Sequence, residues 1–182
     1  MPQDSDKSVS ADGIAAAASK ASKGGLPPVH LWNPPFCGDL DMEIRADGTW
    51  FYLGTPIGRP AMVRLFSTVL KREGDDFFLV TPVEKVGIRV QDAPFVATDA
   101  QIARDKITFT TNVGDQVVAD ADHPIIIRGD IHQPRPYVHV RAGLEALIDR
   151  KTFYRLAAAA DEVDGKVGVQ SSGQFFALEP SP

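Results

Sequence analysis

Two arginines flank the start of a short apolar stripe in the stretch GRPAMVRLF, residues 58–66. A guanidinium group recognises carboxylates and phosphates through two parallel hydrogen bonds. Arg59 directly precedes a predicted helix, at the positive end of its dipole, where a cation gains nothing. Its position therefore indicates a partner, either a carboxylate such as Asp41 or Glu43 or a bound anion. Arg64 lies beside the apolar stripe, where its aliphatic stem can cover the core while the guanidinium stays in water.

More charged residues follow on a predicted strand. Lys85 and Arg89 are four residues apart, so a regular strand points them to the same face, and Asp92 comes just after it. The alternative interpretation is that they are ordinary solvated charges on one sheet face. A second basic set, Arg128, Arg135 and Arg141, lies in the other half of the chain, and phosphate would suit both sets if they faced one groove. The predicted ligand-binding residues are Arg59, Arg64, Lys85, Arg89 and Asp92.

The residue types needed for catalysis or metal binding do not form a recognised pattern. A cysteine nucleophile needs a base and an oxyanion site, and no local motif ties Cys37 to any of the four histidines. We interpret Cys37 as a buried or turn cysteine, with a catalytic or redox-sensing cysteine as the alternative. The spacing of His123, His132 and His139 matches no structural zinc site. We therefore predict no catalytic residues, no metal and no cofactor.

Composition excludes several classes of protein. A formal net charge of −5 over 182 residues argues against broad nucleic-acid binding, which depends on many Lys and Arg contacts to phosphate. The single cysteine excludes an intramolecular disulfide and suits a reducing compartment. No apolar run approaches the roughly 18 residues of a membrane-spanning helix, and the first residues do not resemble a secretory signal. We expect a cytoplasmic protein without membrane insertion.

Hydrophobic patterning predicts many strands and two main helices. The stretch DMEIRADGTWFYLG favours a β-hairpin with a primed turn at Asp47-Gly48. Apolar residues at the 3.6 period predict a helix over 60–72 that starts at Pro60. A second helix is predicted at about 150–161, with Asp149 as its N-cap. Strands are predicted at 77–82 and 85–90, at several places between 95 and 141, and in a terminal hairpin, which together indicate an α+β fold.

The opening stretch recurs later in the chain. Residues 59–65 and 150–156 both read R-x-x-Φ-Φ-R-L, where Φ is apolar or aromatic, at an offset of 91 residues. Two strand-like segments precede each helix and two follow it, which predicts a duplicated unit covering 36–91 and 124–180. The predicted fold is therefore two related subdomains, each a bent antiparallel sheet packed on one amphipathic helix in the order strand-strand-helix-strand-strand. The expected divisions are a disordered or transiently helical tail at 1–25, an N-terminal subdomain at 26–91 and a C-terminal subdomain at 92–182.

A long ordered pattern resembles a known bacterial family. From Trp32 the chain reads WNPPFCGDLDMEIRADGTWFYLGTPIGRPAMVRLF, and further on it reads LVTPVEKVGIRVQDAPF, which ends at Phe95. This is similar to the domain-of-unknown-function family 1285, over most of the chain after about residue 28. The resemblance implies a duplicated core, a C-terminal half superficially like a pleckstrin-homology domain, and a pocket between the halves. It also implies a nucleotide-like ligand and a role in signalling, with no assigned catalytic residues.

These observations rank three hypotheses about function. The leading one is a non-enzymatic ligand-binding or signalling module, with a small anionic ligand in the groove between the subdomains. The alternative is a protein–protein interaction module that uses exposed strand edges or the groove. The third is a cysteine-dependent enzyme or redox sensor that uses Cys37. We therefore expect a binding protein rather than an enzyme.

Overall fold

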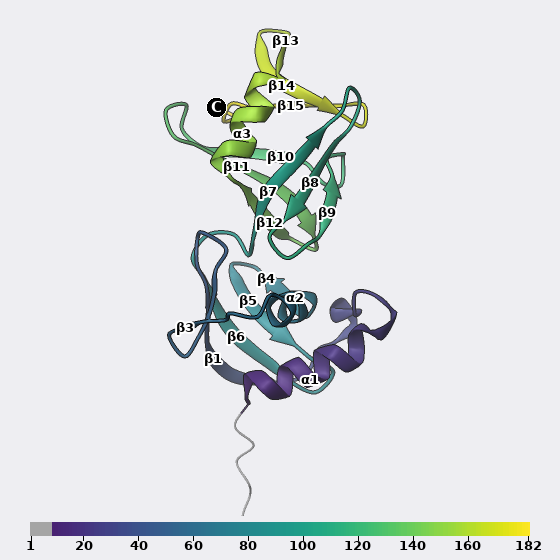
Figure 1. The fold of residues 1–182 in the computed structure, drawn as a ribbon, viewed down its shortest axis with the longest axis vertical. Coiled ribbons are helices and arrows are strands. Elements are labelled where there is room, and N and C mark those ends of the chain that lie inside the picture. Colours follow the sequence, from purple (N-terminus) through teal and green to yellow (C-terminus); the bar gives the residue numbers. More distant parts are fainter. Residues whose placement is uncertain (1–8) are drawn as a thin grey trace, which may run out of the picture. The chain divides into compact units, whose positions relative to one another are not determined.

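The computed structural model describes residues 9–182 and divides them into two compact units (Figure 1). The first unit ends at Gln91 and the second runs from Asp92 to Pro182, with the turn residues Ala46–Gly48 grouped with the second. None of the described helices is long and apolar enough to cross a membrane.

Six strands form the sheet of the first unit. They are β1 (Phe36–Ile44), β2 (Trp50–Tyr52), β3 (Thr55–Pro56), β4 (Leu70–Glu73), β5 (Asp76–Val80) and β6 (Lys85–Val90). Their order is β3-β2-β1-β6-β5-β4, and β1 and β6 form its one parallel pair among antiparallel ones. Along β1, buried Leu40, Met42 and Ile44 alternate with more exposed acidic residues. Since side chains alternate between faces at a period of two, this strand has one core face and one polar face.

The β1–β2 hairpin forms where the sequence predicted it, but its turn is different. The loop is the three residues Ala46–Gly48, closed by a hydrogen bond from Arg45 N to Thr49 O of 2.9 Å. Gly48 has φ of 87°, whereas Asp47 is not among the residues with positive φ. A primed two-residue turn needs positive φ at its first central position, so the predicted turn type was wrong. The observed loop needs only one left-handed residue, which Gly48 supplies.

Helix α2 (Pro60–Thr68) begins at the predicted proline but ends earlier than predicted. The hydroxyl groups of Ser67 and Thr68 each donate to the carbonyl three residues back, at 2.6 Å. Such side-chain bonds compete with continuation of the helix. Leu70 then pairs with Leu79 in the sheet, so residues predicted as the last helical turn belong to β4. The α2 side chains cover the core face of the sheet, where Phe66 stacks on Trp50 at 6.3 Å between ring centroids.

Helix α1 (Ala11–Ala21) lies within the segment expected to be a disordered or transiently helical tail. The Ser10 hydroxyl caps it by accepting from Gly13 N at 3.2 Å. Its Ile14 and Ala18 are fully buried, and α1 packs on α2 (Figure 1). Alanine has the best helix propensity, and its small side chain permits close helix packing, so little apolar volume was needed. Short 3₁₀ turns follow at Ser22–Gly24 and Val29–Leu31. The remainder of the predicted tail, residues 1–8, lies outside the described residues.

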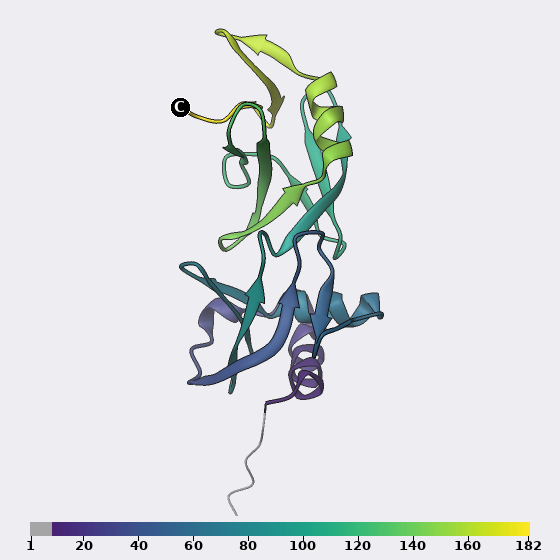
Figure 2. The same ribbon diagram turned by 90° about the vertical axis from the view of Figure 1, so that its left-hand side faces the viewer.

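The second unit contains a sheet of six strands followed by a helix and a small sheet. The strands are β7 (Phe95–Ile102), β8 (Ile107–Thr111), β9 (Gln116–Val118), β10 (Ile125–Gly129), β11 (Pro134–Arg141) and β12 (Leu144–Ile148). Their order is β10-β11-β12-β7-β8-β9, with β12 and β7 parallel. Helix α3 (Arg150–Ala158) comes next, then β13 (Asp161–Val163), β14 (Lys166–Ser171) and β15 (Gln174–Ala177), which form a sheet of their own. Each six-stranded sheet is curled, as Figures 1 and 2 show.

The two large sheets have the same topology, which confirms a duplicated α+β core. In both, the first and sixth strands pair in parallel at the centre. By this correspondence β7 is the counterpart of β1, and β12 is the counterpart of β6. The first copy of the sheet therefore runs from Phe36 to Val90 and the second from Phe95 to Ile148. The predicted second copy at 124–180 began three strands too late, at β10 instead of β7, so the predicted correspondence between the copies was wrong.

The two similar helices hold different places in their units. Helix α2 connects the third and fourth strands of its sheet, whereas α3 follows the sixth. The motif shared by 59–65 and 150–156 is thus a likeness between two non-equivalent helices. Any amphipathic helix with the same apolar period can produce such a match.

Candidate functional site

Lys85 and Arg89, as predicted, belong to the polar face of the first sheet, where acidic neighbours meet them. Arg89 Nη2 lies 2.8 Å from Asp41 Oδ1, and its Nε lies 3.4 Å from Glu43 Oε2. Lys85 Nζ is 2.6 Å from Glu73 Oε2 and 4.3 Å from the centre of the Phe78 ring. The bond from Lys85 lowers the pKa of Glu73, and the bond to Asp41 raises the pKa of Arg89. Both cations are therefore largely neutralised from within the chain.

Arg59 and Arg64 belong to the opposite side of that sheet, with α2. Arg59 is the exposed N-cap residue of α2 and lines a small cavity of about 160 Å³ together with Met62 and Phe66. Arg64 is exposed on the same helix. The carboxylates named as partners for Arg59, Asp41 and Glu43, bind Arg89 instead. The four predicted residues of the first unit therefore do not form one cluster, and their role in ligand binding stays a prediction.

A larger groove lies in the second unit, with a volume of about 890 Å³. Its walls come mainly from the β10–β11 loop, the start of β11, the end of β12 and the start of α3, with Val96 of β7 and the turn residue Ala46. The lining residues are Ala46, Val96, His132, Gln133, Pro134, Arg135, Pro136, Leu147, Ile148, Asp149, Arg150, Phe153 and Tyr154. Three basic side chains and two aromatic rings are thus gathered around one hollow.

Local structure fixes both ends of this groove. The Asp130 carboxylate accepts from the backbone N–H groups of His132 and Gln133 at 2.8 and 2.9 Å, which holds the loop before β11. Gly129 is needed in this loop for two reasons. Its φ of 80° is unfavourable for other residues, and a Cβ atom would clash with Gln133 O at 2.4 Å. At the other end, Asp149 caps α3 as predicted, and accepts from Thr152 N at 2.9 Å.

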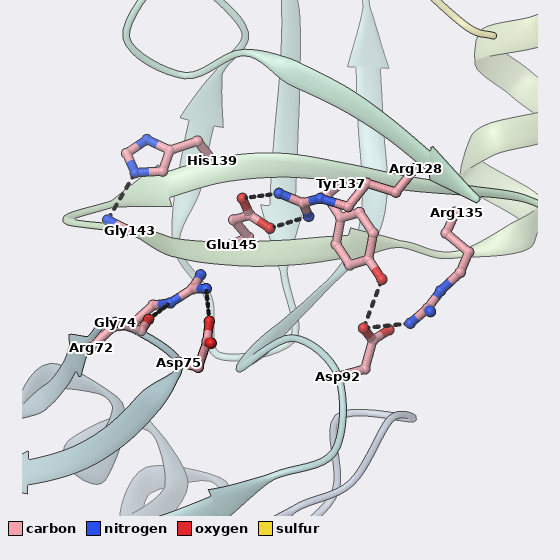
Figure 3. Close-up of polar contacts among 10 residues, drawn as sticks. All are labelled: Arg72, Gly74, Asp75, Asp92, Arg128, Arg135, Tyr137, His139, Gly143 and Glu145. Atoms are coloured by element: carbon pink, nitrogen blue, oxygen red, sulfur yellow. Dashed lines mark hydrogen bonds and ion pairs between the residues drawn. The ribbon is translucent and has the colours of Figure 1, made fainter. Parts of the chain in front are cut away.

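Arg135 forms an ion pair with Asp92, which the sequence analysis grouped with Lys85 and Arg89 instead. Asp92 Oδ1 accepts from Arg135 Nη2 at 2.6 Å and from the Tyr137 hydroxyl at 2.6 Å (Figure 3). Burial, and then the bond to Asp92, raises the pKa of Tyr137 to about 12. The bond to Asp92 also raises the pKa of Arg135. Sequence reasoning grouped Asp92 with Lys85 and Arg89 and missed this pairing, although Arg135 and Tyr137 are two apart on a strand and so share a face.

The other two arginines of the second basic set have partners elsewhere in the second unit. Arg128 forms a two-bond pair with Glu145, at 2.6 and 2.8 Å, and lies 4.8 Å from the centre of the Tyr137 ring (Figure 3). The Glu145 bond raises the pKa of Arg128. Arg141 Nη1 lies 2.6 Å from Asp115 Oδ2. Of this set, only Arg135 lines the groove.

Two of the histidines, His123 and His139, and the cysteine have structural contacts. His139 Nε2 accepts from Gly143 N at 3.0 Å (Figure 3). Its Nδ1 lies 2.9 Å from Asp122 O. His123 Nδ1 bonds Asp120, which lowers the pKa of that carboxyl. Within residues 9–182, no group of three or more His, Cys, Asp or Glu side chains is placed to hold a metal ion. Cys37 is exposed, with its Sγ 3.3 Å from Pro35 O.

The chain is an α+β protein in which one curled six-stranded sheet occurs twice, with few helices. Comparison with known families then places it. The N-terminal domain of the "Domain of unknown function (DUF1285)" family matches residues 27–93, and the "Protein of unknown function (DUF1285), C-terminal domain" matches residues 94–178. The chain therefore belongs to the DUF1285 family. No curated protein matches the sequence.

Two solved structures are similar to this chain. A DUF1285 family protein from Silicibacter pomeroyi DSS-3 is 61% identical, with a TM-score of 0.86 over 94% of this chain and 97% of that one. A DUF1285 family protein from Shewanella baltica OS155 is 28% identical, with a TM-score of 0.52 over 64% of this chain and 89% of that one. Both likenesses agree with the family assignment.

Proposed function

We propose that this protein is a non-enzymatic ligand-binding module that takes a small anionic ligand in the groove of its second unit. The observation that carries the proposal is the gathering of Arg135, Arg150 and His132 around a hollow of about 890 Å³. Of the described residues that line it, Asp149 is the only acidic one, and one of its oxygens already caps α3. A groove with this balance of charge favours an anion.

The position of Arg150 supports an anionic ligand. It is the first residue of α3 and is exposed at the end of the helix where the backbone dipole is positive. An arginine there gains no stability from the dipole, but it adds its charge to that of the helix end. Arg135 contributes a second guanidinium group from β11. Two such groups suit a phosphate, which takes paired hydrogen bonds.

The size and the apolar part of the groove support a ligand larger than a simple ion. Ligand pockets commonly measure about 300 to 1,000 Å³, and this groove lies in that range. Phe153 and Tyr154 line it, and the Tyr154 side chain is well exposed. An exposed ring offers a stacking surface for a planar group. A nucleotide-like ligand, a signalling role and a cytoplasmic setting are parts of the same proposal, whereas a site between the two units stays a sequence prediction.

Thermal unfolding of the full chain with inorganic phosphate, pyrophosphate or AMP tests the proposal. A ligand that binds only the folded state raises the melting temperature. At a ligand concentration of about a hundred times Kd, it increases the free energy of unfolding by about 2.7 kcal/mol. The Arg150→Gln variant should reduce the shift. Arg104→Gln is the matched control, because it removes the same charge from an exposed position of the same unit outside the groove. The absence of a shift with all three compounds would refute the proposal.

A protein–protein interaction module is the second candidate. Two large apolar side chains are exposed at this part of the unit: Ile131, next to the lining residue His132, is 69% exposed and Tyr154 is 62% exposed. Exposed apolar residues beside a groove are typical of binding surfaces. A partner recovered with the full chain should be lost with Ile131→Ser or Tyr154→Ser and kept with Val167→Ser, an exposed apolar residue of β14. Equal recovery with all three variants would count against this function.

A further inference from the structure

In the ion pair between Asp92 and Arg135, the Asp92 side chain is mostly buried and bonded to Tyr137, whereas the Arg135 side chain is exposed. The Asp92 side chain is only 16% exposed, and the Tyr137 residue that bonds the same oxygen is 3% exposed. The Arg135 side chain is 57% exposed and lines the groove. Asp92 bonds both Tyr137 and Arg135 (Figure 3). The carboxylate is therefore fixed by a buried phenol, whereas the guanidinium group belongs to a largely exposed side chain that lines the groove.

The contact also uses the part of Arg135 that a ligand needs. A guanidinium group offers an oxyanion two edges for paired bonds, an end-on edge with Nη1 and Nη2 and a side-on edge with Nε and Nη2. Asp92 binds Nη2, whose two hydrogens serve one edge each, so the bond takes the edge that faces Asp92. That edge is not open to a paired bond with a ligand while Asp92 is bound, and the carboxylate charge opposes a second anion at the rest of the guanidinium group.

From these contacts we propose that Asp92 competes with an anionic ligand in the groove for the guanidinium group of Arg135. Asp92 occupies Arg135 while the groove is empty, and an anion in the groove displaces it and takes the guanidinium group. Tyr137 keeps the carboxylate in place after displacement, so that the ion pair re-forms when the anion leaves. This regulation of the groove rests on the proposed function, because it requires an anionic ligand at Arg135.

Calorimetric titration of the full chain with inorganic pyrophosphate tests the competition. Asp92→Asn preserves the shape of the side chain and an acceptor for Tyr137 but loses the charge that holds Arg135. We expect Asp92→Asn to bind pyrophosphate about tenfold more tightly than the wild type, within the usual range of coupling between contacting residues. Tyr137→Phe loosens the carboxylate without changing any charge, and should tighten binding by about two- to threefold on the same grounds.

A double-mutant cycle separates this competition from a general effect of charge. In an Arg135→Gln background, Asp92→Asn should change the affinity by less than about twofold, because the pair no longer exists. The control Asp105→Asn removes a carboxylate from an exposed position of the same unit outside the groove, and should likewise change little.

Each outcome decides for or against the inference. Tighter binding by Asp92→Asn that disappears in the Arg135→Gln background supports it, as does binding seen with Asp92→Asn but not with the wild type. Equal or weaker binding by Asp92→Asn overturns the competition and leaves the proposed function standing. A gain that persists without Arg135 also overturns it, as a general charge effect. Pyrophosphate binding by neither the wild type nor Asp92→Asn overturns the inference, and the phosphate and AMP measurements then decide whether the proposed function fails as well.

Discussion

Many charged residues that look available in the sequence are paired in the structure, and the setting of each pair differs. The Arg89–Asp41 pair is more than half exposed on both sides, so it contributes little to stability. Arg128 meets Glu145, whose side chain is only 13% exposed, through two bonds. Glu145 would be left without this partner if Arg128 were removed, which costs more than loss of an exposed pair. In the second basic set, only Arg135 combines its ion pair with a place at the groove.

Tyr137 gives a prediction about pH. Its pKa is raised from about 10 to about 12, first by burial and then by its bond to the Asp92 carboxylate. The folded state therefore favours the neutral phenol. The resulting stability is fully present below about pH 10 and is lost as the pH rises through about 12. In a spectrophotometric titration of tyrosinate, Tyr137→Phe should remove an ionisation step near pH 12. Loss of a step near pH 10 would contradict this assignment.

At the scale of elements, the sheet of β13, β14 and β15 has no space for a larger residue at Gly168, because two strand backbones lie close together there. Gly168 of β14 pairs with Ala177 of β15, and the Phe175 ring lies over it. A Cβ atom at position 168 would lie 2.3 Å from Phe176 O, a backbone atom. A Cβ atom at Gly87 of β6 would lie 2.2 Å from Asp39 Oδ1, which is the end of a flexible side chain. The first contact can be relieved only by moving a strand, and the second by rotating a side chain.

We therefore expect Gly168→Ala to reduce the free energy of unfolding by about 2 to 3 kcal/mol, as overpacking does. Gly87→Ala is the matched control and should cost less than about 1 kcal/mol, because Asp39 can move away. Urea unfolding followed by circular dichroism measures both. An equal loss of unfolding free energy for the two variants would contradict the prediction, because it would mean that β15 can move away from Gly168 at little cost.

For the whole molecule, duplication means that each unit has a core of its own. The second unit buries Phe95, Phe109 and Val138 of its large sheet completely, together with Leu156 of α3. A unit whose core is made by its own residues can fold by itself. We therefore expect the fragment 92–182 to show a β-rich circular dichroism spectrum and a cooperative thermal transition. The shorter fragment 92–148 lacks Leu156 and should melt at a lower temperature or not cooperatively. A non-cooperative melt of 92–182 would contradict the prediction.

The sequence predicted the existence of two related subdomains but not how they correspond. The echo between residues 59–65 and 150–156 was easy to see, because a helix repeats its apolar residues every 3.6 positions. The true correspondence joins strands whose side chains share only an alternating pattern, such as those of β1 and β7. A period of two is common to most half-buried strands, so it identifies no particular partner.

The candidate site was predicted to a similar extent. Asp92 was among the predicted residues, and Arg135 was noted as basic, but their ion pair spans 43 residues. The groove itself combines β11, β12 and α3, and Phe153 in its wall is one of the Φ positions of the helix motif at 150–156. Helical spacing predicts which face is apolar, but it does not determine which rings beside that face stay uncovered. Tyr154 is one that does.

The sequence by itself determined the local features: the β1–β2 hairpin, the start of α2 at Pro60 and the cap of α3 at Asp149. These depend on atoms a few residues apart, so the local residue types are sufficient. Only the tertiary structure decided that β1 pairs with β6 in parallel, that α1 packs on α2, and that Asp92 bonds Arg135. Each of these depends on which surfaces are buried together, and a short stretch of sequence does not specify its distant partner.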